Sequence, residues 1–306
     1  MVSGWVILDK PLGLGSTQAV AAVKRNLRQS GYGKGVKVGH GGTLDPLASG
    51  VLPIGVGEAT KLTGRMLDAS KVYEFTVRFG EETSTLDLEG AVVAASEVLP
   101  AKSQIEAVLP RFTGPIDQVP PAYSALKVGG QRAYDLARAG EAVELAERRV
   151  TVHRLTILET EVSEEGLLQS LTLVADVSKG TYIRSLARDV AYAVGTYGTV
   201  TMLRRVKAGP FDVSQAISLD KLNEIGQGAP LEHILLPLEA GLDDIPAIDL
   251  DPEQARAVRQ GRVLTGLPCN DGLHWARLGT TPVALMDLSG GDARVVRGFN
   301  LADVAE

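Results

Sequence analysis

The stretch GHGGTLDPLASGVLP, residues 39–53, carries the strongest structural and chemical signal in the chain. Its four glycines permit positive φ angles and let the backbone approach a ligand closely. Pro46 disfavours a helical conformation for Asp45, so we expect the aspartate to project from a rigid loop, five residues after His40. Catalytic groups are common on such loops. Two plainer interpretations stay open here: Asp45 caps a turn or a helix that begins near Leu47, and His40 is an ordinary surface histidine.

The segments around this stretch predict an α+β fold. Strands are expected where apolar residues are continuous or alternate, and helices where they recur every three or four residues. Because strands outnumber βαβ units, we expect a mixed, largely antiparallel sheet with flanking helices. The predicted strands are 4–9, 72–79 and 168–177; the predicted helices follow the N-cap candidates Ser16 and Thr17 and cover 103–111 and 181–194, with a loop over 114–132.

The length of 306 residues favours two domains. We expect a boundary in the acidic, proline-containing segment GLDDIPAIDLDP (241–252), which gives domains 1–244 and 245–306. The second predicts a helix at 252–260 and three strands near 273–279, 282–288 and 294–299. A single cysteine, the lack of a signal-peptide pattern and the lack of a long apolar run favour a cytoplasmic protein.

The charge is unevenly distributed along the chain. Residues 1–80 carry ten basic and five acidic side chains, whereas residues 211–306 carry seven and fifteen. Such a distribution suits a polyanion bound to one face only. Other site classes lack their patterns: the glycine-rich stretch 31–42 has no phosphate-loop motif, and one cysteine and four scattered histidines do not have zinc-ligand spacing.

Four motifs in a fixed order resemble the TruB family of bacterial tRNA pseudouridine-55 synthases. Residues 39–61 match the pattern GHxGTLDPxAxGxLPxxxGxATK without a gap. LDKPLGLGST (8–17), QVPPAYSALKVGGQRAYDLAR (118–138) and SKGTYIRSLARD (178–189) resemble three further family motifs, and LRR (203–205) also fits. The first of these three departs from the pattern at Gly15, where a threonine is usual.

The resemblance implies an isomerase that detaches uracil from its ribose, rotates the base and rejoins it through C5 without a cofactor or metal. Asp45 matches the essential aspartate, which either attacks C1′ or removes the C2′ proton to form a glycal. Burial alone would raise the pKa of this carboxyl group, so a cation must keep it ionised; Arg184 matches that partner. Tyr73 matches a tyrosine that stacks on the uracil and takes part in moving the C5 proton.

The resemblance also implies tRNA as the partner, with the target uridine extruded from the T-loop. His40 matches the residue that fills the vacated space. We expect phosphate contacts that weaken with salt, a mobile thumb at 120–150 and a PUA-like module at 245–306 that contacts RNA through Arg259, Arg262 or Arg297, if at all. We expect a monomer with no obligate protein partner and no membrane association. Candidate RNA contacts, besides His40, are Lys10, Lys61, Tyr123, Lys127, Arg132, Arg138, Tyr182 and Arg204.

Two other function classes remain to be weighed against an isomerase. A tRNA-binding folding chaperone would not need a carboxylate that faces a polyanion. A glycoside or nucleoside hydrolase usually needs two paired carboxylates, and the sequence offers one strong candidate.

Overall fold

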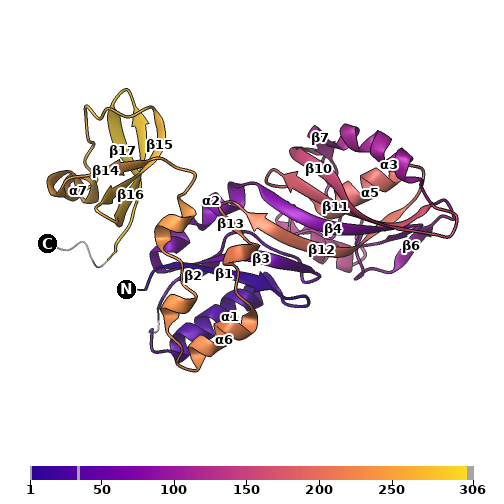
Figure 1. The fold of residues 1–306 in the computed structure, drawn as a ribbon, viewed down its shortest axis with the longest axis horizontal. Coiled ribbons are helices and arrows are strands. Elements are labelled where there is room, and N and C mark those ends of the chain that lie inside the picture. Colours follow the sequence, from indigo (N-terminus) through magenta and orange to yellow (C-terminus); the bar gives the residue numbers. More distant parts are fainter. Residues whose placement is uncertain (1, 33–34, 302–306) are drawn as a thin grey trace.

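The computed structural model describes residues 2–32 and 35–301 of the chain. A large sheet and a smaller C-terminal sheet, both with helices packed against them, organise this part of the chain (Figure 1). The α+β class predicted from the sequence is therefore confirmed. Over the same residues, no helix is long and apolar enough to cross a membrane.

The large sheet is mixed and largely antiparallel, as the sequence predicts. Its pairs are antiparallel except for β3 and β12, which run parallel. The order is β1 (Gly4–Lys10), β3 (Ala48–Val56), β12 (Gly198–Ala208), β4 (Lys71–Phe79), β11 (Leu168–Val177), β10 (Arg148–Val162) and β7 (Gly114–Gln118), with β2 (Val38–His40) beside β3 and β13 (Phe211–Asp212) beside β12.

Strand β1 shows how the sheet acquires apolar cores on both faces. Val6 and Leu8 pack towards α1 (Ser16–Gln29) and α6 (Leu219–Gly226), whereas Trp5 and Ile7 belong to a separate core on the other side. All four side chains are at most 1% exposed, and each such burial contributes about 1.5–3 kcal/mol. Strands β4 and β11 form a third core with α5 (Ile183–Ala193), and Ile105 of α3 (Lys102–Val108) belongs to it.

The C-terminal sheet consists of β14 (Ala247–Asp249), β15 (Gly272–Leu278), β16 (Thr281–Ser289) and β17 (Asp292–Gly298), with α7 (Pro252–Arg259) packed on it. Trp275 and Leu285 of this sheet share a core with Trp5 of the large one. Arg65, in α2 (Thr63–Asp68), also forms an ion pair with Asp244 at 2.9 Å. The domain boundary between residues 244 and 245 stays a prediction.

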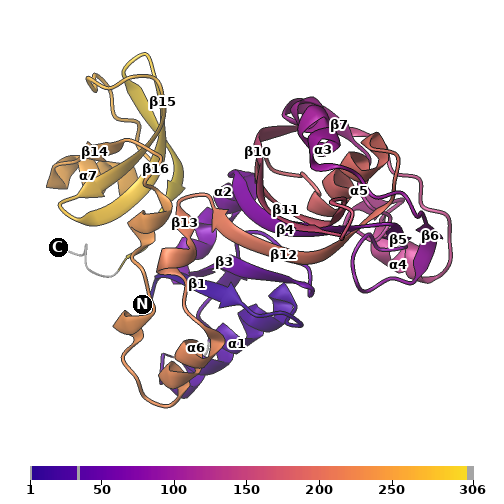
Figure 2. The ribbon, with the colours of Figure 1, turned by 45° about the vertical axis from the view of Figure 1, so that its right-hand side comes forward.

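The connections of the large sheet carry the remaining short elements. Figure 2 shows α4 beside β5 and β6, at the end of the large sheet away from the C-terminal sheet. The short strands and the helix in these connections are β5 (Glu81–Thr83), β6 (Val92–Ala95), β8 (Lys127–Val128), β9 (Gln131–Arg132) and α4 (Ala133–Arg138).

Three local predictions are wrong. No helix begins near Leu47, because the chain enters β3 at Ala48; of the two alternatives for Asp45, the turn is present, with the Ala48 amide donating to the Asp45 carbonyl oxygen at 3.0 Å. The loop predicted at 114–132 contains β7, which tolerates Pro115 because it lies at the edge of the sheet. The N-cap of α1 is Gly15 rather than Ser16 or Thr17.

Candidate active site

The loop that carries Asp45 connects β2 to β3 and is held by buried polar side chains. Ser16 Oγ donates to the Leu44 carbonyl oxygen at 3.0 Å and accepts from the Leu44 amide at 2.9 Å. The hydroxyl predicted to cap a helix therefore positions the residue before Asp45. The Gly15 amide instead donates to the side chain of Gln18 at 2.8 Å, so the departure from the motif leaves that amide satisfied.

Lys10 contacts the same loop from the protein interior. The prediction that it lies on an RNA-binding surface is wrong. Lys10 is 0% exposed. Its ammonium group donates to the carbonyl oxygens of Leu14 at 2.7 Å and Pro46 at 3.5 Å. Burial lowers the pKa of Lys10 to about 8, although the charge of Asp45 acts in the opposite direction. Lys10 shapes the loop and does not meet solvent.

Arg205 is the site residue that the sequence reasoning missed. It is 1% exposed and donates hydrogen bonds to the carbonyl oxygens of Gly42 at 3.1 Å, Thr43 at 3.3 Å and Val51 at 2.7 Å. The signal was the alternation of a strand: in LRR, Arg204 and Arg205 must face opposite sides. Arg204 accordingly leaves the site and forms two hydrogen bonds with Asp9, at 3.0 and 2.8 Å.

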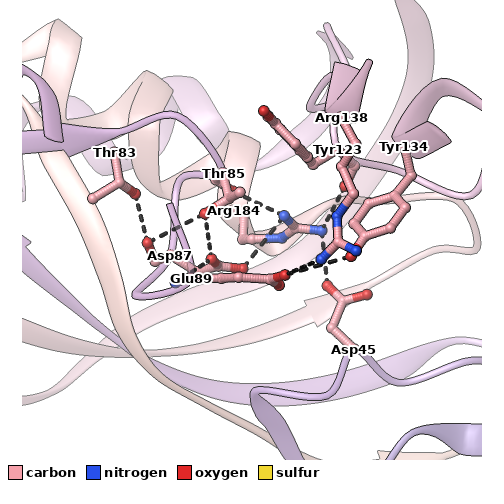
Figure 3. Close-up of polar contacts among 9 residues, drawn as sticks. All are labelled: Asp45, Thr83, Thr85, Asp87, Glu89, Tyr123, Tyr134, Arg138 and Arg184. Atoms are coloured by element: carbon pink, nitrogen blue, oxygen red, sulfur yellow. Dashed lines mark hydrogen bonds and ion pairs between the residues drawn. The ribbon is translucent and has the colours of Figure 1, made fainter. Parts of the chain in front are cut away.

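Arg184 joins Asp45 to the opposite wall of the site. It lies in the first turn of α5, 6% exposed, and its Nη2 donates to Asp45 Oδ2 at 2.8 Å and to the Tyr123 carbonyl oxygen at 3.1 Å. Its Nη1 donates to the Thr85 carbonyl oxygen at 2.8 Å and lies 3.4 Å from Asp87 Oδ2. Figure 3 shows the guanidinium group held between these acceptors. The Asp45–Arg184 pair is therefore a charge-assisted hydrogen bond between a carboxylate and a guanidinium group.

A cavity of roughly 320 Å³ adjoins the Asp45 carboxylate, a volume within the range of small-molecule sites. Tyr73 from β4 and Tyr182, the N-cap of α5, line its walls together with Lys71, Leu203 and Arg205. Burial raises the pKa of Tyr182, so its hydroxyl is protonated at neutral pH. The side chain of Asp45 is 44% exposed, and an occupant of this cavity would cover it.

His40 lies at the end of β2 and is not among the residues that line this cavity. Its Nδ1 accepts a hydrogen bond from the Gly42 amide at 3.4 Å. Burial, with a contribution from the charge of Arg205, lowers the pKa of His40, so the ring is neutral at pH 7. His40 bonds Gly42, which lines the cavity. A neutral imidazole at this position is better suited to packing against a ligand than to binding a phosphate by charge.

The other predicted RNA contacts differ in the exposure of their side chains and in the partners that their charged groups have within the protein. Lys61 bonds Glu58 at 2.6 Å and the Gly298 carbonyl oxygen at 2.8 Å, and thus links the two sheets. Arg138 forms an ion pair with Glu89 at 2.9 Å. The exposed members of the set are Lys127, Arg132, Arg138, Arg259, Arg262 and Arg297.

Within residues 2–32 and 35–301, no three His, Cys, Asp or Glu side chains gather as a metal-binding group. The ionisable groups that meet at Asp45 are instead arginine and lysine side chains that hold backbone carbonyls. The site thus presents the Asp45 carboxylate, paired with Arg184, beside a cavity lined by aromatic and basic side chains.

Family models match most of the chain. Residues 24–183 match the N-terminal domain of the TruB family pseudouridylate synthases. The chain belongs to the TruB family of pseudouridylate synthases. Residues 184–243 match the C-terminal domain described for tRNA pseudouridylate synthase B, so the resemblance drawn from the motifs is confirmed.

Relatives of this TruB-family synthase include two bacterial proteins named tRNA pseudouridine synthase B. The protein of Novosphingobium aromaticivorans is 74% identical over the whole of both chains. That of Zymomonas mobilis is 55% identical over 97% of this chain and 96% of its own. Both alignments include the C-terminal sheet.

Among solved structures, the chain resembles a protein in a crystal structure of a Cbf5–Nop10–Gar1 complex, with a TM-score of 0.73 and 25% identity over 98% of this chain and 86% of that one. It has the same TM-score, at 23% identity, to a chain in an H/ACA ribonucleoprotein bound to a substrate RNA that contains 2′-deoxyuridine, over 99% of this chain and 87% of that one. The likeness in fold therefore extends across both sheets.

Proposed function

We propose that this TruB-family synthase converts uridine 55 in the T-loop of tRNA to pseudouridine, with Asp45 as the catalytic residue. The relatives' shared name supports tRNA as the substrate. The motifs of the Asp45 loop and the KGTYIR segment, which resemble those of pseudouridine-55 synthases, support uridine 55 as the target. Residues of both segments line one cavity.

One observation carries the assignment of Asp45. Its Oδ2 accepts the hydrogen bond from Arg184, whereas no described residue donates to its Oδ1. A carboxylate with one oxygen anchored by a cation and the other free beside a cavity can act as a nucleophile or a base. Among the residues that the structure describes, Asp45 supplies the one carboxylate that lines this cavity, which speaks against the paired-carboxylate chemistry of a hydrolase.

Two paths fit this geometry. In the first, Oδ1 forms a bond to C1′ while the C1′–N1 bond breaks and its electron pair leaves with the uracil; C5 of the rotated base then attacks C1′ and releases the carboxylate. In the second, the carboxylate removes the C2′ proton as the C1′–N1 bond breaks, and it returns this proton to C2′ as C5 bonds to C1′. Both paths return Asp45 to its starting state.

Aromatic and neutral groups complete the proposed mechanism. Tyr73 stacks on the uracil from the cavity wall, and its hydroxyl is our candidate to relay the proton that C5 loses after it has joined C1′, while N1, which left C1′ with its electron pair, gains a proton. A base enters this cavity only after leaving the RNA stack, and the neutral His40 then occupies the vacated space. Exposed cations such as Lys127 and Arg132 contact phosphates, which makes binding sensitive to salt.

We assign catalysis and the secondary RNA contact to different parts of the chain. Residues 1–244 carry the chemistry, and residues 245–306 form a PUA-like module whose contact with RNA is secondary because the C-terminal third of the chain is acidic. We expect the enzyme to act as a monomer. Size-exclusion chromatography with light scattering checks the last point.

The decisive experiment incubates the purified protein with an unmodified tRNA transcript and maps pseudouridine by carbodiimide labelling and primer extension. A single stop at the T-loop uridine, lost in Asp45→Asn while tRNA binding persists, is the expected result. Asp249→Asn is the matched control, because it removes a carboxylate that is paired with Arg277 at 2.6 Å far from the cavity. Full modification by Asp45→Asn, or release of free uracil, would overturn the proposal. Binding without modification by the wild type would instead indicate the chaperone.

A further inference from the structure

We propose that Glu89 is a positioning residue that couples docking of the segment 119–147 to the alignment of Arg184 with Asp45. This segment connects β7 to β10 and includes α4. The inference rests on the proposed function, because its consequence for rate requires that the Asp45–Arg184 pair performs the chemistry.

The turn formed by residues 85–89 holds Arg184 in place. It supplies the Thr85 carbonyl oxygen and the Asp87 carboxylate to Nη1 of the guanidinium group. Leu86 has a φ of +63°, a conformation that leucine adopts only under constraint. The Leu86 carbonyl oxygen accepts from the Val200 amide at 3.0 Å. The turn is therefore a fixed platform attached to β12.

The same turn holds the segment 119–147 through the side chain of Glu89. Its Oε1 accepts from Arg138 Nη2 at 2.9 Å and lies 3.4 Å from the Tyr134 hydroxyl. The Arg138 guanidinium carbon lies 4.5 Å above the centre of the Tyr134 ring. In Figure 3 the carboxylate of Glu89 reaches from the turn towards both side chains of α4. Glu89 is thus the contact between the turn and the helix of this segment.

Docking of the segment completes the surroundings of Arg184. The Tyr123 carbonyl oxygen accepts from Nη2, the same nitrogen that donates to Asp45. The rings of Tyr123 and Tyr134 meet edge to face at 6.1 Å, so the start of the segment and α4 are packed together. Within the turn, the Glu89 amide donates to Asp87 Oδ1 at 3.0 Å. One turn therefore contacts both Arg184 and the segment that supplies another of its acceptors.

The strength of the Glu89–Arg138 contact fits a reversible latch. Their side chains are 40% and 59% exposed, and an exposed ion pair shifts an equilibrium by up to about fivefold. Ser124 and Ala125 of the segment line the cavity, so the position of the segment affects the space that a nucleotide can occupy.

The test compares single-turnover rates at saturating enzyme, and tRNA dissociation constants, for wild type, Glu89→Gln, Arg138→Gln and the double variant. We expect each single variant to slow the single-turnover rate about three- to fivefold, and the double variant to be no slower than either; in Glu89→Gln the dissociation constant should change less than twofold. The charge exchange Glu89→Arg with Arg138→Glu should restore the rate to within twofold of wild type. Glu81→Gln, which removes a similarly exposed pair with Arg78 at 3.1 Å, is the matched control.

A second measurement does not depend on activity. Hydrogen exchange of the free protein should become about three- to fivefold faster at amides 123–138 in Glu89→Gln, and unchanged in Glu81→Gln. Failure of the proposed function would leave this difference in place. Unchanged exchange, a wild-type rate for Glu89→Gln, or single effects that add in the double variant would overturn the role of Glu89.

Discussion

Arg205 Nη2 donates a hydrogen bond across 3.1 Å to the carbonyl oxygen of Gly42, three residues before Asp45. This bond and those to Thr43 and Val51 tie the loop that carries Asp45 to β12. Tyr73 lies opposite Arg205 in the β4–β12 pair, and Gly50 lies opposite it in the β3–β12 pair. Tyr73, Arg205 and Gly50 thus form a row across three strands, and the Arg205 side chain connects this row with the start of the Asp45 loop.

We predict that Arg205→Met lowers the single-turnover rate of pseudouridine formation about 10- to 100-fold while tRNA affinity changes little. The substitution removes the donors of three backbone carbonyls and frees the loop, and a displacement of about 1 Å can lower a rate by about 100-fold. Each buried carbonyl left without a partner also destabilises the fold by about 1–3 kcal/mol. Urea unfolding and single-turnover kinetics measure the two effects.

Arg204→Met tests whether that loss of stability is specific to the buried arginine. The Arg204→Met variant loses a partly exposed ion pair with Asp9, so the free energy of unfolding of this variant should differ from that of the wild type by about 1 kcal/mol or less. Equal destabilisation of the two variants would contradict the structural role assigned to Arg205.

Gly50 makes the close approach of β3 to β12 possible, and Gly50→Ala should destabilise the protein by more than about 3 kcal/mol. A Cβ atom there would lie 2.2 Å from the Arg205 carbonyl oxygen, and φ is +102°. Gly166→Ala is the matched control, because φ is +79° and its Cβ would meet nothing within 4 Å. The control should lose only about 1–3 kcal/mol through backbone strain. If urea unfolding gives equal losses for the two, steric contact with Arg205 is not the reason for the glycine.

The sequence predicted the parts of this site that lie in continuous motifs. The alternation of residues 72–79 placed Tyr73 on a strand, and the helical spacing of 181–194 placed Arg184 at a helix start; both elements are confirmed by β4 and α5. Their meeting with the Asp45 loop depends on the β3–β12 and β4–β12 pairings. Pairing between distant strands is not encoded in local periodicity.

The buried cations show where local reasoning fails. Lys10 resembles a surface lysine in the sequence, yet its ammonium group is buried among the carbonyl oxygens of Pro11 and Leu14, beside it in the chain, and of Pro46 in the Asp45 loop. Ser16 is a good N-cap residue, but the Leu44 backbone competes for its hydroxyl. In both cases a buried polar group is satisfied by hydrogen bonds, and the packing of distant segments decides which groups become buried.

Lys71 provides a prediction on pH dependence. Its ammonium group donates to the carbonyl oxygens of Met66, Leu67 and Ala69 at 2.8, 2.7 and 2.6 Å. Burial, together with the nearby charge of Arg205, lowers the pKa of Lys71 to about 8. In the unfolded chain the pKa of a lysine is about 10.4.

Between about pH 8 and pH 10 the unfolded chain therefore binds more protons at Lys71 than the folded chain does, so the contribution of Lys71 to stability rises with pH. We predict that the free energy of unfolding of the wild type, minus that of Lys71→Met, increases across this window by at most about 1.4 kcal/mol per pH unit and is flat below pH 7. Urea unfolding of both proteins from pH 6 to pH 10 measures this difference, in which the titration of Lys10 and the tyrosines cancels. A difference that falls as the pH rises would show that Lys71 keeps its proton more firmly in the folded protein, and that its three carbonyl partners outweigh its burial.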